Sequence, residues 1–225
     1  MRLFHINHDR TRLLIFFGGF YTDYNCFKNF DTKTSDILFI NDYSNMDFEE
    51  LRYFDFTPYT EINLIAYSYG VWALNCAYLI KALPEINKSV AISGTFCPVH
   101  TVFGINPKVF NIMLNAMSIS ALGTKTIENF EQNMLANCDG RENFKKAERT
   151  LENLRQELIS IKNNAKECRM EDGFQFDSVI LTKDDKIFPF RAQDEFFKDH
   201  PHRVILNTGH FPFFEFESLD EILEL

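Results

Sequence analysis

Short apolar runs recur along the chain, separated by segments in which apolar residues follow a helical spacing. The runs are continuous rather than alternating, which is typical of strands in a parallel sheet that helices cover on both faces. The predicted strands are residues 1–6, 12–17, 37–40, 62–66, 89–92, 179–181 and 204–206. This pattern predicts an α/β protein with a mostly parallel central sheet and flanking helices.

Local signals add an opening turn and three helices to this outline. The turn-forming residues 7–10 predict that the first two strands pair as a hairpin. Helices are predicted at 71–83, where Pro84 closes the segment, at 190–198, and after Ser218 near the carboxyl end.

A helical stretch interrupts the alternation between residues 95 and 175. Pro107 begins a segment with a broad apolar face, and the helical spacing continues through Phe130 and then from Phe144 to Ile161. About 80 residues between two strands are too many for a loop. We therefore expect one domain, 1–225, with 95–175 inserted as a helical cap over the sheet edge that binds ligands.

Ser68 lies between a predicted strand and a predicted helix, in the sequence Ala-Tyr-Ser-Tyr-Gly at 66–70. A nucleophile elbow needs small residues two places before and after the serine, because larger side chains would clash with neighbouring backbone. Glycine is usual at both places, and this chain has Ala66 at the first. The alternative is a serine that caps an ordinary helix, and so short a motif does not decide between them.

A serine nucleophile requires a base and an acid that orients the base. In α/β-hydrolases these follow in the chain order Ser, acid, His, after late strands. Asp185 follows the strand that ends at Leu181, and His210 follows the strand that ends at Leu206. We predict a catalytic triad of Ser68, Asp185 and His210 in an α/β-hydrolase fold. Asp184 is the alternative acid, and a turn carboxylate with a surface histidine is the simpler interpretation.

Ester hydrolysis also needs donors for the oxyanion. The backbone N–H of Tyr69, the residue after the serine, is one candidate. The second is the N–H of Phe20, since Gly18 and Gly19 before it allow the backbone to approach a substrate closely. The paired glycines could equally form a plain turn.

Charge and composition exclude several functions. A net charge of −9 argues against nucleic acid as the main partner. The amino-terminal residues lack the apolar run of a signal peptide, and no apolar stretch reaches membrane-spanning length. We therefore expect a cytoplasmic protein without membrane contact.

The cysteines do not suggest a shared site. They are odd in number and form no CxxC pair: Cys26, Cys76, Cys97, Cys138 and Cys168. We expect scattered buried thiols in a reducing compartment, without a disulfide framework or a zinc site. No metal and no cofactor are implied.

Several motifs together resemble those of one family. They are the Phe-Phe-Gly-Gly-Phe loop at 16–20, Asp-Tyr at 42–43, the serine motif at 66–72, the strand exit at 91–95, the cap entrance at 103–110, and Gly-His-Phe-Pro-Phe at 209–213. On these residues the chain resembles the BioG family of pimeloyl-acyl carrier protein methyl ester esterases over nearly its whole length. The D-x-I-x-P spacing of the family selects Asp185 over Asp184. Phe20 departs from the tryptophan that the family more often has.

The resemblance implies a reaction of biotin biosynthesis. The esterase would remove the methyl group from the ester of pimeloyl-acyl carrier protein, releasing methanol. Acyl carrier protein is acidic, and the segment 141–162 has a net charge of +2. We expect basic residues there to dock the carrier, namely Arg141, Lys145, Lys146 and Arg149. The alternative is a solvated helix face with ordinary ion pairs.

Two other functions stay open. The chain could be another serine hydrolase, such as a general carboxylesterase or a thioesterase, because fold and triad do not separate these activities. It could also be a binding protein that keeps the fold without catalysis, although none of the three triad residues is missing from the sequence.

Overall fold

The computed structural model describes residues 1–30, 32–165, 168 and 170–225. The described residues form a seven-stranded sheet with the order β1-β3-β2-β4-β5-β6-β7. β1 runs antiparallel to β3, and all other neighbouring strands are parallel. The strands are β1 (Arg2–Ile6), β2 (Arg12–Phe17), β3 (Asp36–Asn41), β4 (Glu61–Tyr67), β5 (Lys88–Ile92), β6 (Ser178–Thr182) and β7 (Arg203–Leu206). The expectation of a mostly parallel sheet is confirmed.

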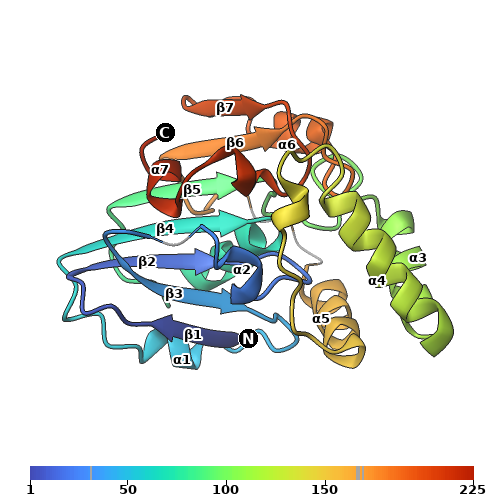
Figure 1. Ribbon diagram of the computed structural model, residues 1–225, viewed down its shortest axis with the longest axis horizontal. Helices are drawn as coiled ribbons and strands as arrows, with labels where there is room; N and C mark the ends of the chain where they lie inside the picture. Colours follow the sequence, from blue (N-terminus) through green and yellow to red (C-terminus); the bar gives the residue numbers. More distant parts are fainter. Residues whose placement is uncertain (31, 166–167, 169) are drawn as a thin grey trace.

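Helices flank this sheet (Figure 1). The helical elements outside the insertion are η1 (Tyr24–Phe27), α1 (Glu49–Arg52), α2 (Tyr69–Leu79), α6 (Phe190–Phe196), η3 (Pro212–Glu215) and α7 (Leu219–Ile222). Every side chain of β3 is buried, and so is every side chain of β4 from Ile62 onward. Both faces of these central strands are therefore covered, which explains why their sequences are mostly apolar.

The predicted hairpin at the start of the chain is wrong. β1 pairs with β3, with Leu3 opposite Ile40, and β2 lies between β3 and β4. The burial of the two strands explains this arrangement: five of the six β2 residues are buried, whereas β1 is mostly exposed. A strand buried on both faces belongs inside the sheet, and an exposed strand fits its edge.

The insertion between β5 and β6 contains α3 (Pro107–Met117), α4 (Ser120–Met134), η2 (Arg141–Asn143) and α5 (Leu151–Asn164). α3 begins at Pro107 as predicted, and the Asn106 side chain caps it by accepting from the Lys108 N–H. α3, α4 and α5 stand beyond the ends of the parallel strands, at the right of Figure 1. They therefore lie at the sheet edge where β4, β6 and β7 end, shortly before Ser68, Asp185 and His210.

The prediction that the helical pattern continues from Phe144 is wrong for residues 144–150, which form no helix. The Glu148 N–H donates to Asp23 Oδ2 at 2.6 Å, and the Phe144 ring packs against Phe211 with 5.2 Å between centroids. α5 starts only after Thr150, whose hydroxyl accepts from the Asn153 N–H. Contacts with distant parts of the chain thus replace helical hydrogen bonds in this segment.

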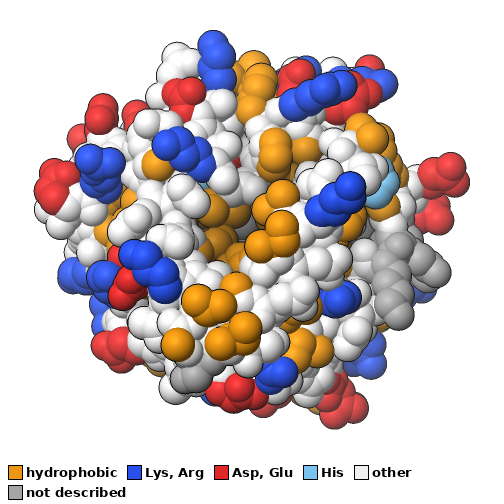
Figure 2. All heavy atoms as spheres, turned by 90° about the vertical axis from the view of Figure 1, so that its right-hand side faces the viewer, with side chains coloured by type: hydrophobic (Ala, Val, Ile, Leu, Met, Phe, Trp, Pro, Cys, Tyr) orange, Lys and Arg blue, Asp and Glu red, His pale blue; other side chains and the backbone are white. Residues whose placement is uncertain are grey.

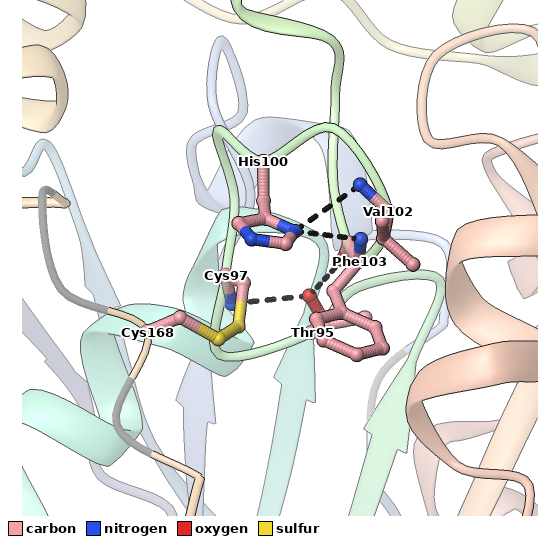
Figure 3. Close-up of a disulfide and its surroundings, with 6 residues drawn as sticks. All are labelled: Thr95, Cys97, His100, Val102, Phe103 and Cys168. Atoms are coloured by element: carbon pink, nitrogen blue, oxygen red, sulfur yellow. Dashed lines mark hydrogen bonds between the residues drawn. A yellow bond between two sulfur atoms is a disulfide. The ribbon is translucent and has the colours of Figure 1, made fainter.

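Cys97 and Cys168 form a disulfide, which corrects the expectation that all cysteines are scattered thiols. Their Cα atoms lie 4.9 Å apart although the residues are separated by 71 positions. Cys97 belongs to the loop after β5, where the Thr95 hydroxyl accepts from the Cys97 N–H and donates to Phe103 O (Figure 3). Cys168 follows α5, so the bond joins the two ends of the insertion. Sequence spacing could not show this contact, because only the fold brings the two cysteines together.

We expect reduction of this disulfide to destabilise the protein. A cross-link that closes a loop of this length stabilises a fold by about 4 kcal/mol in the chain-entropy model. Dithiothreitol should therefore lower the Tm of the wild type by roughly 10 °C. The Cys97→Ser/Cys168→Ser variant should melt at the lower temperature with or without the reductant. Equal melting of the wild type in both conditions would contradict the cross-link.

Candidate active site

Ser68 occupies a tight turn between β4 and α2. Its backbone has φ 55° and ψ −121°, in a region that non-glycine residues rarely adopt. A Cβ atom on Gly70 would lie 2.2 Å from Phe17 O, and one on Gly94 would lie 2.2 Å from Ser68 O. Only glycine fits at these two positions. The turn therefore has the packing that a nucleophile elbow requires.

The Ser68 side chain does not cap α2. It makes no capping hydrogen bond, and its Oγ lies 2.9 Å from Nε2 of His210. The helix-cap interpretation therefore fails, since the hydroxyl is paired with a residue 142 positions away.

His210 connects Ser68 to Asp185. Its Nδ1 lies 2.7 Å from Oδ2 of Asp185, and the side chains of both residues are buried. Asp184 is exposed, and its backbone N–H donates to Thr208 O. The structure thus brings together Ser68, His210 and Asp185, and it places Asp184 outside this cluster. A hydroxyl, an imidazole and a carboxylate in this order can activate the hydroxyl as a nucleophile.

The Asp185 carboxylate is held by several donors besides His210. Its Oδ1 accepts from the N–H groups of Ile187 and Phe188, both at 2.7 Å. Its Oδ2 accepts from the Thr182 hydroxyl at 3.1 Å and from Gln193 Nε2 at 3.0 Å. These contacts fix the direction in which the carboxylate faces the imidazole.

Gln193 was not singled out in the sequence, where it is one polar residue within a helix. Its side chain is fully buried, donates to Phe188 O at 2.7 Å and accepts from the Thr182 N–H at 3.1 Å. It thus joins the end of β6 to the turn after Asp185. A polar residue on the inner face of a helix that follows the predicted acid was the available signal.

Phe20 and Tyr69, the predicted oxyanion donors, flank Ser68. Tyr69 is the first residue of α2, where a backbone N–H has no acceptor inside the helix. A Cβ atom on Gly19 would lie 2.9 Å from Cβ of Ser68, so the loop before Phe20 touches the serine. The Tyr43 hydroxyl donates to Gly18 O at 2.7 Å and fixes the start of this loop. The Tyr69 N–H and the loop that carries Phe20 therefore both lie at Ser68, where an oxyanion hole requires its donors.

A cavity of about 320 Å³ opens beside these residues, between the sheet edge and helices α3 and α4. Its walls are mostly apolar and include Phe20, Tyr69, Phe110, Met113, Phe130 and Ile187. Figure 2 shows hydrophobic side chains gathered around a hollow on this face. Such a cavity suits an aliphatic chain better than a polar or charged ligand.

The four predicted docking residues have different surroundings. Arg141, Lys145 and Lys146 are exposed. The Arg149 side chain is only 3% exposed and lies between Asp42, at 3.2 Å, and Glu157, at 2.7 Å. The prediction that Arg149 contacts a carrier protein is therefore wrong, because its charge is already paired inside the protein. The four residues also do not share one helix, since α5 begins at Leu151.

Two other features concern the described part of the chain, namely metal sites and membrane-spanning helices. No group of three or more His, Cys, Asp or Glu side chains there could hold a metal ion. None of the described helices combines the length and the apolar character that crossing a membrane requires.

The family model described as "Pimeloyl-ACP methyl esterase BioG" matches residues 1–222. Among solved structures, BioG from Haemophilus influenzae superimposes with a TM-score of 0.81 at 20% identity, covering 99% of this chain and 100% of that one. An esterase from Exiguobacterium antarcticum superimposes with a TM-score of 0.68 at 12% identity, covering 99% and 91%. The chain has the α/β-hydrolase fold, and the family whose model it matches is one of methyl esterases.

A curated relative is a longer protein. "Malonyl-[acyl-carrier protein] O-methyltransferase" from Bacteroides fragilis is 27% identical over 197 residues, which are 87% of this chain. The chain spans only 38% of that protein's length.

We expect Gln193→Ala to lower kcat for a small aryl ester by roughly tenfold with little change in KM. Loss of its contact with Asp185 would misalign the acid and the imidazole, and such misalignment slows chemistry without weakening binding. The exposed Gln156→Ala variant on α5 serves as the control and should keep wild-type kinetics. An unchanged kcat in Gln193→Ala would show that the other donors orient Asp185 sufficiently.

Proposed function

The chain belongs to the BioG family of pimeloyl-acyl carrier protein methyl esterases, and on this premise we propose that it hydrolyses the methyl ester of pimeloyl-acyl carrier protein. The products would be methanol and pimeloyl-acyl carrier protein. The reaction would be a step of biotin biosynthesis. The observation that carries the proposal is the cluster of Ser68, His210 and Asp185 beside an apolar cavity.

In the first half of the proposed reaction, Ser68 Oγ attacks the carbonyl carbon of the methyl ester while His210 Nε2 takes the hydroxyl proton. Asp185 accepts the Nδ1–H of His210 and stabilises the imidazolium that forms. The N–H groups of Phe20 and Tyr69 hold the negative charge on the tetrahedral oxygen. The tetrahedral intermediate then collapses: the bond to the methoxy oxygen breaks, His210 gives that oxygen its proton, and methanol leaves.

In the second half, a water molecule attacks the acyl-enzyme, and His210 takes its proton. The bond to Ser68 Oγ breaks, and Oγ recovers the proton from His210. The free carboxyl group of the pimeloyl chain is the product. The same donors serve both tetrahedral intermediates, because each has its oxyanion in the same place.

The apolar cavity supports an acyl substrate. Its volume of about 320 Å³ exceeds the roughly 210 Å³ that seven carbon atoms occupy if each takes the volume of one liquid water molecule, ~30 Å³. The walls from α3 and α4 belong to the insertion, so we propose that residues 95–175 act as a cap that shapes the acyl site.

Docking of acyl carrier protein is assigned to the exposed basic residues of the insertion, Arg141, Lys145 and Lys146. The protein as a whole carries a net charge of −9, so an acidic carrier needs a local basic surface. We propose the cytoplasm as the compartment of this reaction. Reductants there keep most thiols reduced. The melting experiment with dithiothreitol therefore also measures how stable the protein is when the Cys97–Cys168 disulfide is reduced.

The main test compares wild type and Ser68→Ala on pimeloyl-acyl carrier protein methyl ester and on a small aryl ester. Ser68→Ala should lose at least ~10³-fold in kcat on both, because the nucleophile is gone. The wild type should favour the carrier-bound ester in kcat/KM. Full activity of Ser68→Ala would overturn the triad. A triad-dependent activity without preference for the carrier-bound ester would indicate a general carboxylesterase, and release of the carrier thiol would indicate a thioesterase.

A second test concerns docking. Arg141→Glu/Lys145→Glu should raise KM for the carrier-bound ester by roughly tenfold, since two attractive charges become repulsive. KM for the aryl ester should stay unchanged. The matched control reverses two exposed lysines elsewhere, Lys33→Glu/Lys198→Glu, and should affect neither substrate. An equal rise in KM for both esters in the first variant would refute docking at this surface.

A further inference from the structure

Tyr21 belongs to the loop at 18–22, which carries the proposed oxyanion donor Phe20 and is called the oxyanion loop below, and it links this loop to the cap. It follows Phe20 directly, is buried, and its hydroxyl donates to Oε2 of Glu131 on α4 at 2.5 Å. Burial, and next the hydrogen bond to Glu131, raise the pKa of Tyr21 far above that of a free tyrosine. The phenol therefore stays protonated and can act as a permanent donor to the carboxylate.

The backbone of Tyr21 is strained. Its φ is 74°, in the left-handed region that a tyrosine rarely adopts. Such a conformation persists only where surrounding contacts impose it. From the sheet side, the Thr22 hydroxyl donates to Gly19 O at 2.8 Å, and Asn41 Nδ2 donates to Thr22 O at 3.0 Å. From the cap side, the Tyr21 hydroxyl is hydrogen-bonded to the Glu131 carboxylate and to the backbone of Ala147.

α4 holds the loop through a second, neighbouring residue. The Phe130 ring packs edge-on against Phe20, with 5.1 Å between centroids, and contacts the Tyr21 ring at 6.1 Å. Two adjacent residues of the cap therefore contact two adjacent residues of the loop. Phe130 makes apolar contacts, and Glu131 makes a hydrogen bond.

Glu131 has a second partner that orients it. Lys146 Nζ lies 2.8 Å from Glu131 Oε1, so the two carboxylate oxygens serve different partners. Glu131 is 15% exposed and Lys146 71% exposed. The lysine neutralises the carboxylate from the solvent side, which leaves Oε2 directed at the buried hydroxyl.

We infer that Glu131 is a positioning residue: through Tyr21 it holds the Phe20 N–H where the oxyanion develops. The inference rests on the proposed function, in which Phe20 is an oxyanion donor. It adds a role of the cap in the chemical step, beyond lining the acyl cavity. The opposing interpretation is that the contact merely anchors α4 to the body of the protein.

The test uses Tyr21→Phe, Glu131→Ala and the double variant, with a small aryl ester that does not require the carrier protein. Each single variant should lower kcat about tenfold, since a displaced donor forfeits part of the 10²- to 10³-fold that one oxyanion donor contributes. KM should stay within about twofold. The double variant should be no slower than either single variant, because both remove the same contact.

A boronic acid inhibitor separates positioning from anchoring. It forms a tetrahedral adduct with a serine hydroxyl and places one oxygen in the oxyanion site, so its Ki should rise by about the same factor as kcat falls. Glu131→Gln keeps an acceptor oxygen for Tyr21 while losing the charge pair with Lys146, and it should retain most of the activity. Glu128→Ala removes an exposed acidic residue of the same helix and should behave as wild type.

The outcomes distinguish this inference from the proposed function. Lower Tm with wild-type kcat and Ki in Tyr21→Phe and Glu131→Ala would show that the contact only anchors the cap. Ser68→Ala provides the other comparison: if it abolishes turnover while the Glu131 and Tyr21 variants do not, only the positioning role fails. If Ser68→Ala retains turnover, the proposed function itself fails.

Discussion

The close approach of three backbone segments at Ser68 is the constraint on which the rest of this structure depends. Gly70 lies against Phe17 O at the end of β2, and Gly94 lies against Ser68 O after β5. A methyl group at either glycine would separate β2, β4 and β5 at the edge where the site is built. The positive φ of Ser68 persists because these contacts leave the turn no alternative. The parallel strands β6 and β7 end at the same edge and place Asp185 and His210 there.

Buried charges connect the cap to this edge. Arg149, just before α5, lies between Glu157 on α5 and Asp42 after β3. Burial raises the pKa of Glu157, and the Arg149 charge opposes that rise. Losing one partner of such a pair typically costs ~3–5 kcal/mol, because a charge is left unpaired in the interior. Glu157 also accepts from the Tyr43 N–H, and the Tyr43 hydroxyl holds Gly18. The insertion, the sheet and the loop at Gly18 are thus joined by one network of contacts.

The structural features that short segments determine by themselves could be predicted from the sequence. The strands were visible as apolar runs, and the start of α3 was visible from Pro107. The spacing of Ser68, Asp185 and His210 after strands sufficed to expect that they meet. The errors concern partners that are distant in sequence: β1 with β3, Cys97 with Cys168, and Arg149 with Asp42. Local propensity contains no information about such pairs, and the contacts of 144–150 override it.

The sheet is a general feature of this protein, and the insertion is a more particular one. The sheet fold is shared with an esterase that is only 12% identical, so it accommodates many substrates. The cavity walls of α3 and α4, by contrast, come from the insertion, which the family match of residues 1–222 includes. Phe130 both lines that cavity and packs against Phe20. An acyl chain that fills this cavity, as proposed, would touch a residue that also packs against Phe20, so acyl binding and the proposed chemical step would be connected through one side chain.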